Sequence, residues 1–302
     1  MSAPAVTVRV PAKVNVQLAV GPARPDGFHD LANIFLAVGL YDEVTATPAE
    51  RLRLTCEGPG AEQVPLDEGN LAARAALALA ERAGRPADVH LHIAKDIPVA
   101  GGMAGGSADA AGALLACETL WRTGASRDEL LAICAELGSD VPFSYVGGAA
   151  LGTGRGELLT PLAVGGTFHW VFAQADGGLS TPAVYGAYDR LAETEGRRVP
   201  APEADQAVID ALASGDPKAL AAAVHNDLQT AALDLFPALR RTLDAGTEAG
   251  ALAALVSGSG PTTAFLAPDA DSARTIARAL TPHCRTARTT TAPAPGAVVV
   301  GE

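Results

Sequence analysis

A glycine-rich segment that runs directly into a helix of small residues constrains this chain more than any other feature. Residues 97–115 read Ile-Pro-Val-Ala-Gly-Gly-Met-Ala-Gly-Gly-Ser-Ala-Asp-Ala-Ala-Gly-Ala-Leu-Leu. Glycines allow backbone conformations and close approaches that side chains prevent, so successive N–H groups can converge on an anion. We expect Ser107 at the N-cap of the following helix, whose free N–H groups and dipole favour a phosphate. The segment therefore predicts a phosphate-binding loop.

A glycine cluster also marks an ordinary tight turn between a strand and a helix, and from this segment alone that alternative stays open. Two known nucleotide-binding loops are excluded by spacing. A P-loop requires a lysine directly after its last glycine, and none follows here. The dinucleotide-binding pattern Gly-x-Gly-x-x-Gly is absent, because the pairs 101–102 and 105–106 have the wrong separation. A nucleotide site here is therefore of another type.

The charge of the chain limits its partners. The 302 residues carry a formal net charge of −12, which makes nucleic acid and an anionic membrane surface poor candidates. An anionic substrate must then be held by local positive groups, and lysine occurs only as Lys13, Lys95 and Lys218. No run approaches the roughly 18 apolar residues of a membrane span, and the four cysteines have no metal or redox spacing. We expect a soluble cytoplasmic protein.

Alternation of apolar and polar residues predicts a first half rich in strands. We expect strands at 6–18, either two or one bent at Pro11, and at 31–44, 51–56 and 89–94. Helices are expected at 70–83, capped by Asn70, at 107–120, and at 126–137, which opens on a capping box. The glycine-dense residues 147–156 predict a bulged strand or a hairpin, and we place a domain boundary directly after them, giving domains 1–156 and 157–302.

The second half alternates strands and helices without the regular period of a parallel sheet, which favours an α+β fold over a doubly wound one. The expected strands are 168–173, 252–256, 263–266 and a short edge strand at 298–300. The expected helices are 181–188, 205–213, 217–224, 228–233, 237–249 and 271–280. Residues 289–295 are rich in threonine, proline and alanine, and are predicted to be a low-complexity segment.

Several polar residues outside the glycine-rich segment are candidates for chemistry. Lys13 and Asn15 project from one face of a strand whose other face is apolar, which is a rigid placement for a charge and an amide, although an ordinary exposed strand face looks the same. Asp140 lies between a helix stop and Val-Pro, where a simple N-cap is the alternative. Phe28 and His29 pair an aromatic ring with hydrogen-bonding groups and could read a nucleobase.

Three motifs in this order resemble those of the GHMP small-molecule kinases, and the resemblance covers nearly the whole chain. They are Pro-Ala-Lys-Val-Asn-Val at 11–16, Pro-Val-Ala-Gly-Gly-Met-Ala-Gly-Gly-Ser-Ala-Asp at 98–109, and Val-Ser-Gly-Ser-Gly-Pro at 256–261. The resemblance implies a two-domain α+β GHMP kinase fold, with a ribosomal-protein-S5-domain-2-like ATP-binding domain followed by a ferredoxin-like α/β-sandwich domain. It also implies ATP and Mg²⁺ as cofactors.

Within this family, Asp-Gly-Phe-His-Asp-Leu at 26–31 and Gly-Ser-Asp-Val-Pro-Phe at 138–143 are similar to members with a cytidine-bearing substrate. The implied reaction is ATP-dependent phosphorylation of the 2-hydroxyl of 4-diphosphocytidyl-2-C-methyl-D-erythritol, in non-mevalonate isoprenoid precursor biosynthesis. A homoserine or mevalonate kinase of the same family is one alternative, but it has no need of a base-reading pair. A non-catalytic ligand sensor with this fold is another, and retention of Lys13 and Asp140 argues against it.

The resemblance implies a role for each matching residue. Asp140 matches the catalytic aspartate and Lys13 the lysine that pairs with it. Substrate contacts are implied for Asn15, Phe28, His29, Thr181 and Tyr185. ATP contacts are implied for Asn70, Lys95, Pro98, Val99, Ala100, Gly101, Gly102, Met103, Ala104, Gly105, Gly106, Ser107 and Ala108.

Two departures from the family pattern affect the glycine-rich segment. Met103 and Ala104 stand where relatives commonly carry Leu-Gly, and methionine is a tolerable apolar replacement. Ala108 stands where a second serine is frequent, so Ser107 is the remaining side-chain hydroxyl for a phosphate or Mg²⁺. Asp109 is a candidate helper, and no metal ligand is assigned.

Overall fold

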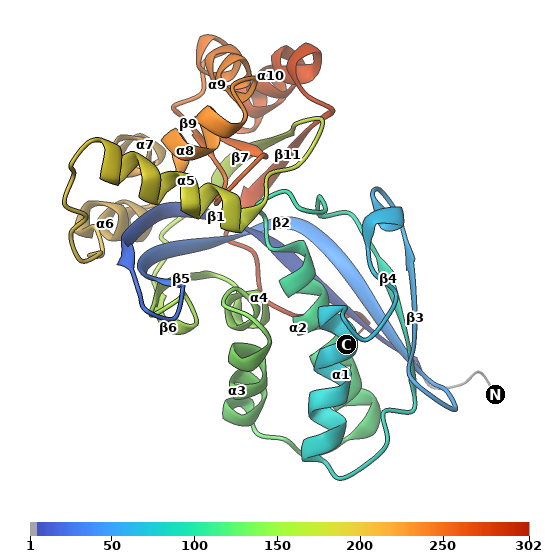
Figure 1. Ribbon diagram of the computed structural model, residues 1–302. Coiled ribbons are helices and arrows are strands. Elements are labelled where there is room, and N and C mark those ends of the chain that lie inside the picture. Colours follow the sequence, from blue (N-terminus) through green and yellow to red (C-terminus); the bar gives the residue numbers. More distant parts are fainter. Residues whose placement is uncertain (1–4, 302) are drawn as a thin grey trace.

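The computed structural model describes residues 5–301 and contains two sheets with helices packed against them (Figure 1). The strands are β1 (Val6–Ala23), β2 (His29–Pro48), β3 (Arg53–Glu57), β4 (Val89–Ala94), β5 (Ala149–Thr153), β6 (Leu158–Leu162), β7 (Phe168–Gln174), β8 (His225–Asn226), β9 (Ala253–Val256), β10 (Thr263–Ala267), β11 (Thr286–Ala292) and β12 (Val298–Val299). Most of these strands were predicted from the alternation of the sequence, whereas β6, the two-residue β8 and β11 were not.

The helices follow the predicted positions closely. They are α1 (Leu71–Arg82), α2 (Gly105–Trp121), α3 (Arg127–Leu137), α4 (Val141–Val146), α5 (Thr181–Thr194), α6 (Gln206–Ser214), α7 (Pro217–Ala223), α8 (Gln229–Leu235), α9 (Leu239–Glu248) and α10 (Ala270–Leu280), with short 3₁₀ turns η1 (Ala61–Gln63) and η2 (Thr281–His283). The Asn70 cap of α1 and the Ser126/Glu129 capping box of α3 are both present. In the described residues, no helix has the length and apolar character needed to cross a bilayer.

The first sheet is built around two unusually long strands. β1 and β2 pair antiparallel along most of their length, with register shifts at Pro11/Ala12, Asn15/Gln17 and Val20/Ala23. Residues 6–23 therefore form one bent strand rather than two, because bulges absorb the irregularity at Pro11. The central path of the sheet is β12-β1-β2-β4-β3, and helices α1 to α4 pack on one side of it (Figure 1).

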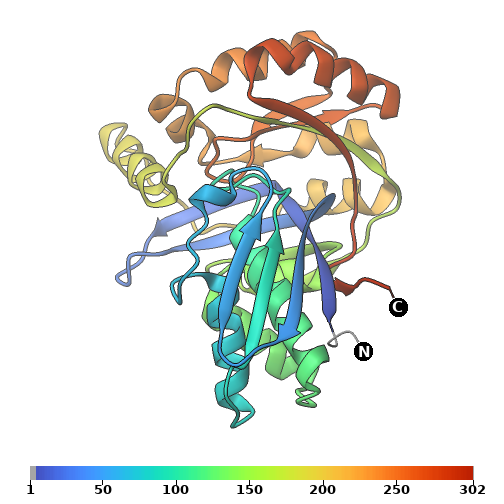
Figure 2. The same cartoon turned by 90° about the vertical axis from the view of Figure 1, so that its right-hand side faces the viewer.

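The second sheet has the order β11-β7-β10-β9, with every neighbouring pair antiparallel. Taken in chain order, its strands and the helices between them give a βαββαβ arrangement with strand order 4-1-3-2. The predicted ferredoxin-like second domain is thereby confirmed. In the view of Figure 2, this unit lies across the end of the first sheet, with α9 and α10 on its outer side.

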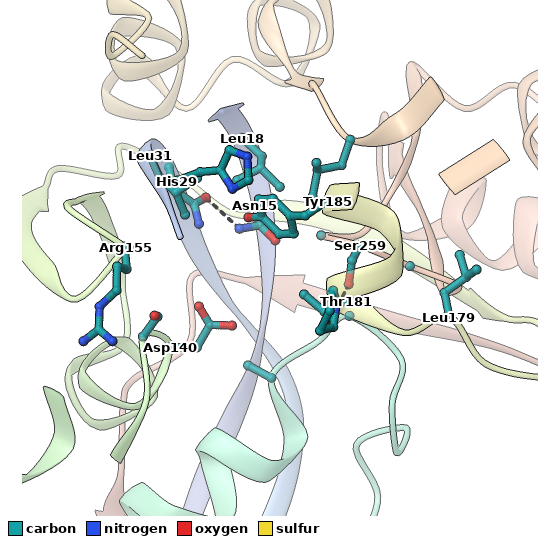
Figure 3. A pocket seen from close by; sticks show the side chains of 18 of the residues that line it. Asn15, Leu18, His29, Leu31, Asp140, Arg155, Leu179, Thr181, Tyr185 and Ser259 are labelled. Atoms are coloured by element: carbon teal, nitrogen blue, oxygen red, sulfur yellow. Dashed lines mark hydrogen bonds between the residues drawn. The ribbon is translucent and has the colours of Figure 1, made fainter. Parts of the chain in front are cut away.

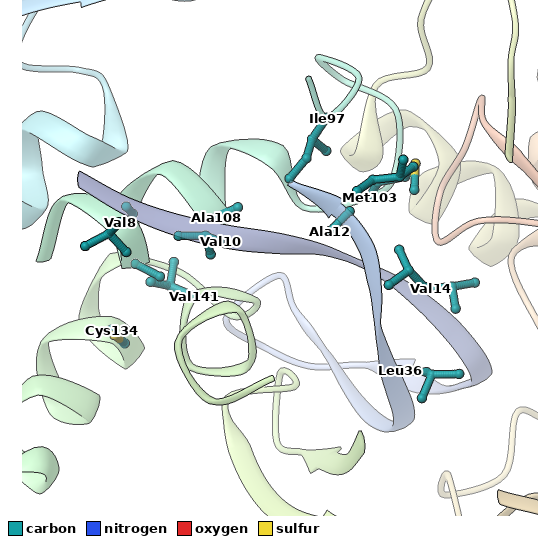
Figure 4. Packing of buried hydrophobic residues seen from close by; sticks show 14 of the residues in the cluster. Val8, Val10, Ala12, Val14, Leu36, Ile97, Met103, Ala108, Cys134 and Val141 are labelled. Carbon is teal, nitrogen blue, oxygen red and sulfur yellow. The ribbon is translucent and has the colours of Figure 1, made fainter. Parts of the chain in front are cut away.

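Each hydrophobic cluster contains residues from both halves of the chain. Val8 and Val10 of β1 lie beside Ala108 of α2 (Figure 4), and the same contiguous cluster reaches Phe168 and Trp170 of β7. A second cluster joins the far ends of β1 and β2 to α5, α8, α9 and α10. Each long strand therefore contributes to both cores, so burial of apolar surface fixes the two units against each other.

The pairing of strands departs from the predicted domain boundary. A division after residue 156 cuts the β5–β6 hairpin, in which Ala149 is paired with Leu162. Residues 298–299 also return to the first sheet, where β12 pairs with β1. Residues 286–292 form the edge strand β11, which corrects the prediction of a low-complexity segment, because its threonines alternate beside β7.

Candidate active site

The glycine-rich segment connects β4 to α2 through an unusual backbone path. Ala100, Gly102 and Ala104 have φ values of 53°, 73° and 63°. These left-handed residues alternate with others, which is the geometry that turns successive N–H groups toward one side. Seven residues of this segment line one cavity: Ala100, Gly101, Gly102, Ala104, Gly105, Gly106 and Ser107.

Ser107 is not the N-cap of the helix, which corrects the sequence-based expectation. α2 begins at Gly105, and its cap is Ala104 in the left-handed conformation. Ala108 already donates its backbone N–H to the Ala104 carbonyl at 2.8 Å. Glycine is compatible with helical geometry despite its low helix propensity, so Gly105 and Gly106 join the helix, which begins three residues before a cap at Ser107 would place it. Ser107 therefore lies in the first turn of α2, and it still lines the cavity.

Replacement of Gly102 by alanine tests the tight packing of this loop. A Cβ at this position would lie 2.1 Å from the Ser257 carbonyl oxygen, and its φ of +73° is unfavourable for alanine. We expect a loss of about 1–2 kcal/mol from the backbone alone, together with a KM for ATP raised roughly tenfold as the loop shifts. Chemical denaturation and steady-state kinetics measure the two effects. Gly124→Ala is the matched control, because Gly124 also has positive φ but meets no atom within 4 Å.

The cavity that receives the loop is about 860 Å³ in volume, a size that suits a nucleotide-sized ligand. It lies between the two units, so β1, β2, the glycine-rich loop, α5 and residues 258–260 all contribute to its wall. Figure 3 shows His29 and Tyr185 near one another in the upper part of the cavity, with Asp140 below them. The sequence-predicted residues Lys13, Asn15, Phe28, His29, Asp140, Thr181 and Tyr185 all line it.

Asp140 is free to act in the cavity. Its backbone caps α4, but its side chain makes no capping hydrogen bond, so the simple N-cap alternative is excluded. Its Oδ2 lies 3.6 Å from Nζ of Lys13, and the Asp140 side chain is 31% exposed whereas that of Lys13 is 7% exposed. A largely buried ammonium therefore faces a carboxylate that solutes can reach.

A chain of hydrogen bonds fixes the position of Lys13. Its Nζ donates to Asn15 Oδ1 at 2.6 Å, and Asn15 Nδ2 donates to Asn33 Oδ1 at 2.6 Å. The Lys13 backbone N–H also donates to the Met103 carbonyl at 3.3 Å, which joins β1 to the glycine-rich loop. All three side chains are buried, so their orientation is set by the fold rather than by solvent.

The opposite end of the cavity is aromatic. The rings of His29 and Tyr185 are tilted by 35° with centroids 5.0 Å apart. Burial raises the pKa of the Tyr185 hydroxyl, which therefore stays protonated at neutral pH. Phe28 is 47% exposed and carries the Arg155 guanidinium 5.1 Å from its ring centroid. An exposed ring beside a buried aromatic pair can accept a flat heterocycle by stacking.

Loops of the second unit close the cavity against the glycine-rich segment. Thr181 Oγ1, at the first turn of α5, lies 2.9 Å from Ser259 Oγ. Ser257 Oγ donates to the Gly102 carbonyl at 3.1 Å. The Ser-Gly-Ser-Gly loop at 257–260 thus holds both the helix that carries Tyr185 and the loop predicted to bind phosphate.

Comparison with known proteins is consistent with this arrangement. The sequence models for the GHMP kinases N terminal domain and the GHMP kinases C terminal match residues 70–148 and 208–285. A Streptomyces avermitilis protein named 4-diphosphocytidyl-2-C-methyl-D-erythritol kinase is 77% identical over 297 residues, covering 98% of this chain and 99% of that protein. The chain belongs to the GHMP kinases. A Mycolicibacterium smegmatis protein of the same name is 56% identical and covers 98% of this chain and 92% of its own.

GHMP kinases of known structure share the fold. A crystal structure of 4-(cytidine 5'-diphospho)-2C-methyl-D-erythritol kinase superimposes with a TM-score of 0.78 and 34% identity, covering 95% of this chain and 99% of that one. A homoserine kinase from Cytophaga hutchinsonii has a TM-score of 0.72 at 18% identity, with 99% and 98% covered, and supports the fold alone. The two-domain α+β GHMP kinase fold is therefore confirmed.

Some residues expected to contact ATP lie outside the cavity wall of this GHMP kinase. Met103 and Ala108 are fully buried in the hydrophobic core, and Pro98 and Val99 are half-buried and do not line the cavity. Asn70 is buried at the start of α1, where Oδ1 accepts from Ala72 N at 2.8 Å and Nδ2 donates to the Pro65 carbonyl at 2.7 Å. Both of its polar groups are thereby engaged in local structure.

Lys95 lies under the loop in a buried ionic cluster. Its Nζ contacts Asp42 Oδ2 and lies 2.8 Å from Asp109 Oδ2. Asp42 Oδ1 accepts the backbone N–H groups of Asp96 and Ile97 at 2.6 and 2.8 Å, so the cluster fixes the start of the loop. Burial alone would lower the pKa of Lys95, but the two carboxylates raise it, and the ammonium stays charged. Lys95 therefore supports the loop from below.

The same cluster makes folding stability depend on pH. Burial, opposed by Lys95, raises the pKa of the Asp109 carboxyl from 3.8 to about 7. Between these values the folded chain holds a proton that the unfolded chain has lost, so this group stabilises the fold below about pH 4, and the contribution is lost as the pH rises through about 7. We expect Asp109→Asn to flatten the decline in unfolding free energy between pH 4 and 8. Denaturant unfolding across that range measures it, and an unchanged slope contradicts it.

The cavity wall also contains polar residues that sequence reasoning did not propose, among them Asn33, Arg155 and Asp189. Arg155 follows β5 in the glycine-dense hairpin, where a lone cation among glycines was a usable signal. Asn33 and Asp189 carried none, because their partners Asn15 and His29 lie 18 and 160 residues away in sequence. Their importance appears only when the strands and α5 come together.

Mg²⁺ is the metal that the family implies. In residues 5–301 there is no cluster of three or more potential His, Cys, Asp or Glu ligands. Mg²⁺ bound to a nucleotide needs only one or two protein oxygens, since phosphates and waters complete its shell. Ser107 and Asp140 both line the cavity and fit that requirement, whereas Asp109 is buried and paired with Lys95. The donor set suits a metal that arrives with its nucleotide.

Proposed function

We propose that this chain transfers the γ-phosphoryl group of ATP to the 2-hydroxyl of 4-diphosphocytidyl-2-C-methyl-D-erythritol, giving the 2-phosphate and ADP. The reaction belongs to non-mevalonate isoprenoid precursor biosynthesis. The observation that carries this proposal is one continuous cavity that holds a glycine-rich loop, the Lys13–Asp140 pair and the aromatic residues Phe28, His29 and Tyr185. The names of relatives up to 77% identical agree with it.

In the proposed reaction Asp140, Lys13 and the backbone N–H groups of the glycine-rich loop each have one role. Asp140 accepts the proton of the 2-hydroxyl while that oxygen forms a bond to the γ-phosphorus and the bond from phosphorus to the β,γ-bridging oxygen breaks. Lys13 holds Asp140 in place, at 3.6 Å, and offsets the negative charge that gathers there. Backbone N–H groups of the loop bind phosphate oxygens. Phosphoryl transfer depends mainly on such positioning and charge stabilisation.

Ser107 and Asp140 would hold Mg²⁺ through the nucleotide, and the bound ion would neutralise charge on the β- and γ-phosphate oxygens. The remaining interactions are the chain's own. Phe28, His29 and Tyr185 hold the cytosine ring, and Asn15 and Thr181 line the same cavity and contact the rest of the substrate. No nucleic acid or membrane enters the proposed reaction, and we place it in the cytoplasm.

The direct test is incubation with magnesium ATP and 4-diphosphocytidyl-2-C-methyl-D-erythritol, followed by ³¹P spectroscopy of the product. Formation of the 2-phosphate with equimolar ADP is expected. A folded, ATP-binding protein that yields no such product would exclude the proposed function.

Two other functions predict different results. A homoserine or mevalonate kinase with this fold has no use for a base-binding end, so cytidine nucleotides would not compete with its substrate. A ligand sensor would bind the cytidine compound without consuming ATP. Competition by CDP together with ATP turnover supports the proposed kinase against both.

A further inference from the structure

We propose that Asp189 is a positioning residue, which fixes the tautomer of His29 so that its ring selects cytosine over uracil. This inference rests on the proposed function, in which the cavity receives a cytidine diphosphate. Asp189 lies on α5 of the second unit, whereas His29 begins β2 of the first. Base selection is therefore assigned to a contact that exists only between the two units.

The contact determines which nitrogen of the imidazole carries hydrogen. His29 Nε2 lies 2.9 Å from Asp189 Oδ1, and the His29 side chain is only 6% exposed. A carboxylate oxygen only accepts, so Nε2 is the donor, and the neutral ring then has a lone pair at Nδ1. Within residues 5–301 Nδ1 has no hydrogen-bond partner. It is also not one of the unpartnered polar atoms that are fully buried, so solvent or a ligand can reach it. Nδ1 is thus an acceptor that a ligand in the cavity can reach.

The ring is held on its other sides by the same helix. Tyr185, one turn before Asp189, lies against His29 with ring centroids 5.0 Å apart, and Tyr188 meets it edge-on at 6.4 Å. The Tyr188 hydroxyl donates to the Val20 carbonyl at 2.9 Å, which anchors α5 to β1. Two aromatic contacts and one carboxylate therefore leave the imidazole with a defined plane and a defined tautomer.

An acceptor at Nδ1 distinguishes the two pyrimidines. Cytosine presents an exocyclic amino group, which donates, whereas uracil presents a carbonyl oxygen at the same position, which only accepts. With uracil, two acceptors face each other in a site from which water is displaced. Leaving such a buried pair unsatisfied costs roughly tenfold to a hundredfold in affinity, which is the selectivity we assign to this contact.

The test compares cytidine and uridine ligands in wild type, Asp189→Ala and Asp189→Leu. Calorimetric binding of CDP and UDP needs no turnover, so it separates this inference from the proposed function. We expect wild type to prefer CDP by at least about tenfold, and both variants to bind the two nucleotides within about threefold of each other. In kinetics, KM for the cytidine substrate should rise about tenfold, while kcat and KM for ATP stay within about twofold.

A spectroscopic readout and a control complete the test. Imidazole ¹⁵N shifts should show His29 protonated at Nε2 in wild type and a mixture of tautomers in Asp189→Ala. Glu193→Gln removes an exposed carboxylate from the same helix and should leave the CDP/UDP ratio unchanged. A wild-type His29 protonated at Nδ1, or a folded Asp189→Ala protein with wild-type selectivity, would overturn the inference. Wild-type selectivity for CDP without phosphorylation would instead reject the proposed function and leave this one standing.

Discussion

Asp140→Asn should nearly abolish turnover while leaving the cytidine substrate bound. The amide keeps the size of the carboxylate but cannot accept the proton of the attacking hydroxyl, and loss of a general base typically lowers the rate by about 10²- to 10⁴-fold. Because Asp140 makes no capping hydrogen bond in α4, the substitution removes no local structure. Single-turnover kinetics should show the loss in the chemical step, with KM for the cytidine substrate changed little.

The matched control is Asp128→Asn, which removes an exposed carboxylate from the first turn of α3 and lies outside the cavity. Its turnover should equal that of wild type. If Asp140→Asn retained more than about a tenth of wild-type kcat, the assignment of Asp140 as the base would be wrong.

Lys95→Met should cause the largest loss of folding stability. The substitution leaves Asp42 and Asp109 buried without the cation that lies between them. Removing one partner of a buried ion pair typically costs about 3–5 kcal/mol, since the remaining charge is uncompensated. Guanidinium chloride unfolding should report a decrease of this size, and KM for ATP should rise because Asp42 no longer holds the start of the loop in place.

Lys218→Met is the control for loss of a lysine, since Lys218 is exposed and lies at the start of α7. It should change the unfolding free energy by no more than about 0.5 kcal/mol. Combining Lys95→Met with Asp109→Asn should recover part of the loss, because only one acid then lacks a partner. Equal stability of Lys95→Met and wild type would show that the cluster carries no net stabilisation.

Sequence reasoning located the site well where its residues form local patterns. Lys13 and Asn15 alternate along one strand, Phe28 and His29 are adjacent, and the glycine-rich segment is continuous. Each pattern can therefore be recognised from the sequence alone. All of these lie at one cavity. The fold class followed for the same reason, since alternation and helix caps are local signals.

The remaining features depend on contacts between distant segments. Lys95 was expected to bind ATP, but its position relative to the loop depends on Asp42, 53 residues earlier, which draws it into the core. Ser107 was predicted as the N-cap of α2, but the N-cap is Ala104 in the left-handed conformation, which the helix propensities of these residues do not predict. The predicted boundary after residue 156 falls inside the β5–β6 hairpin, whose hydrogen bonds join residues on both sides of it.

The return of β12 to the first sheet governs the order in which the protein can be completed during synthesis. Val8 pairs with Val299, so this part of β1 lacks its partner until a segment that is far later in the sequence has been synthesised. Until then one edge of β1 lacks its partner there, a state that invites pairing with other chains. A nascent chain stalled before residue 293 should therefore bind holding chaperones through β1, even with its glycine-rich loop already translated.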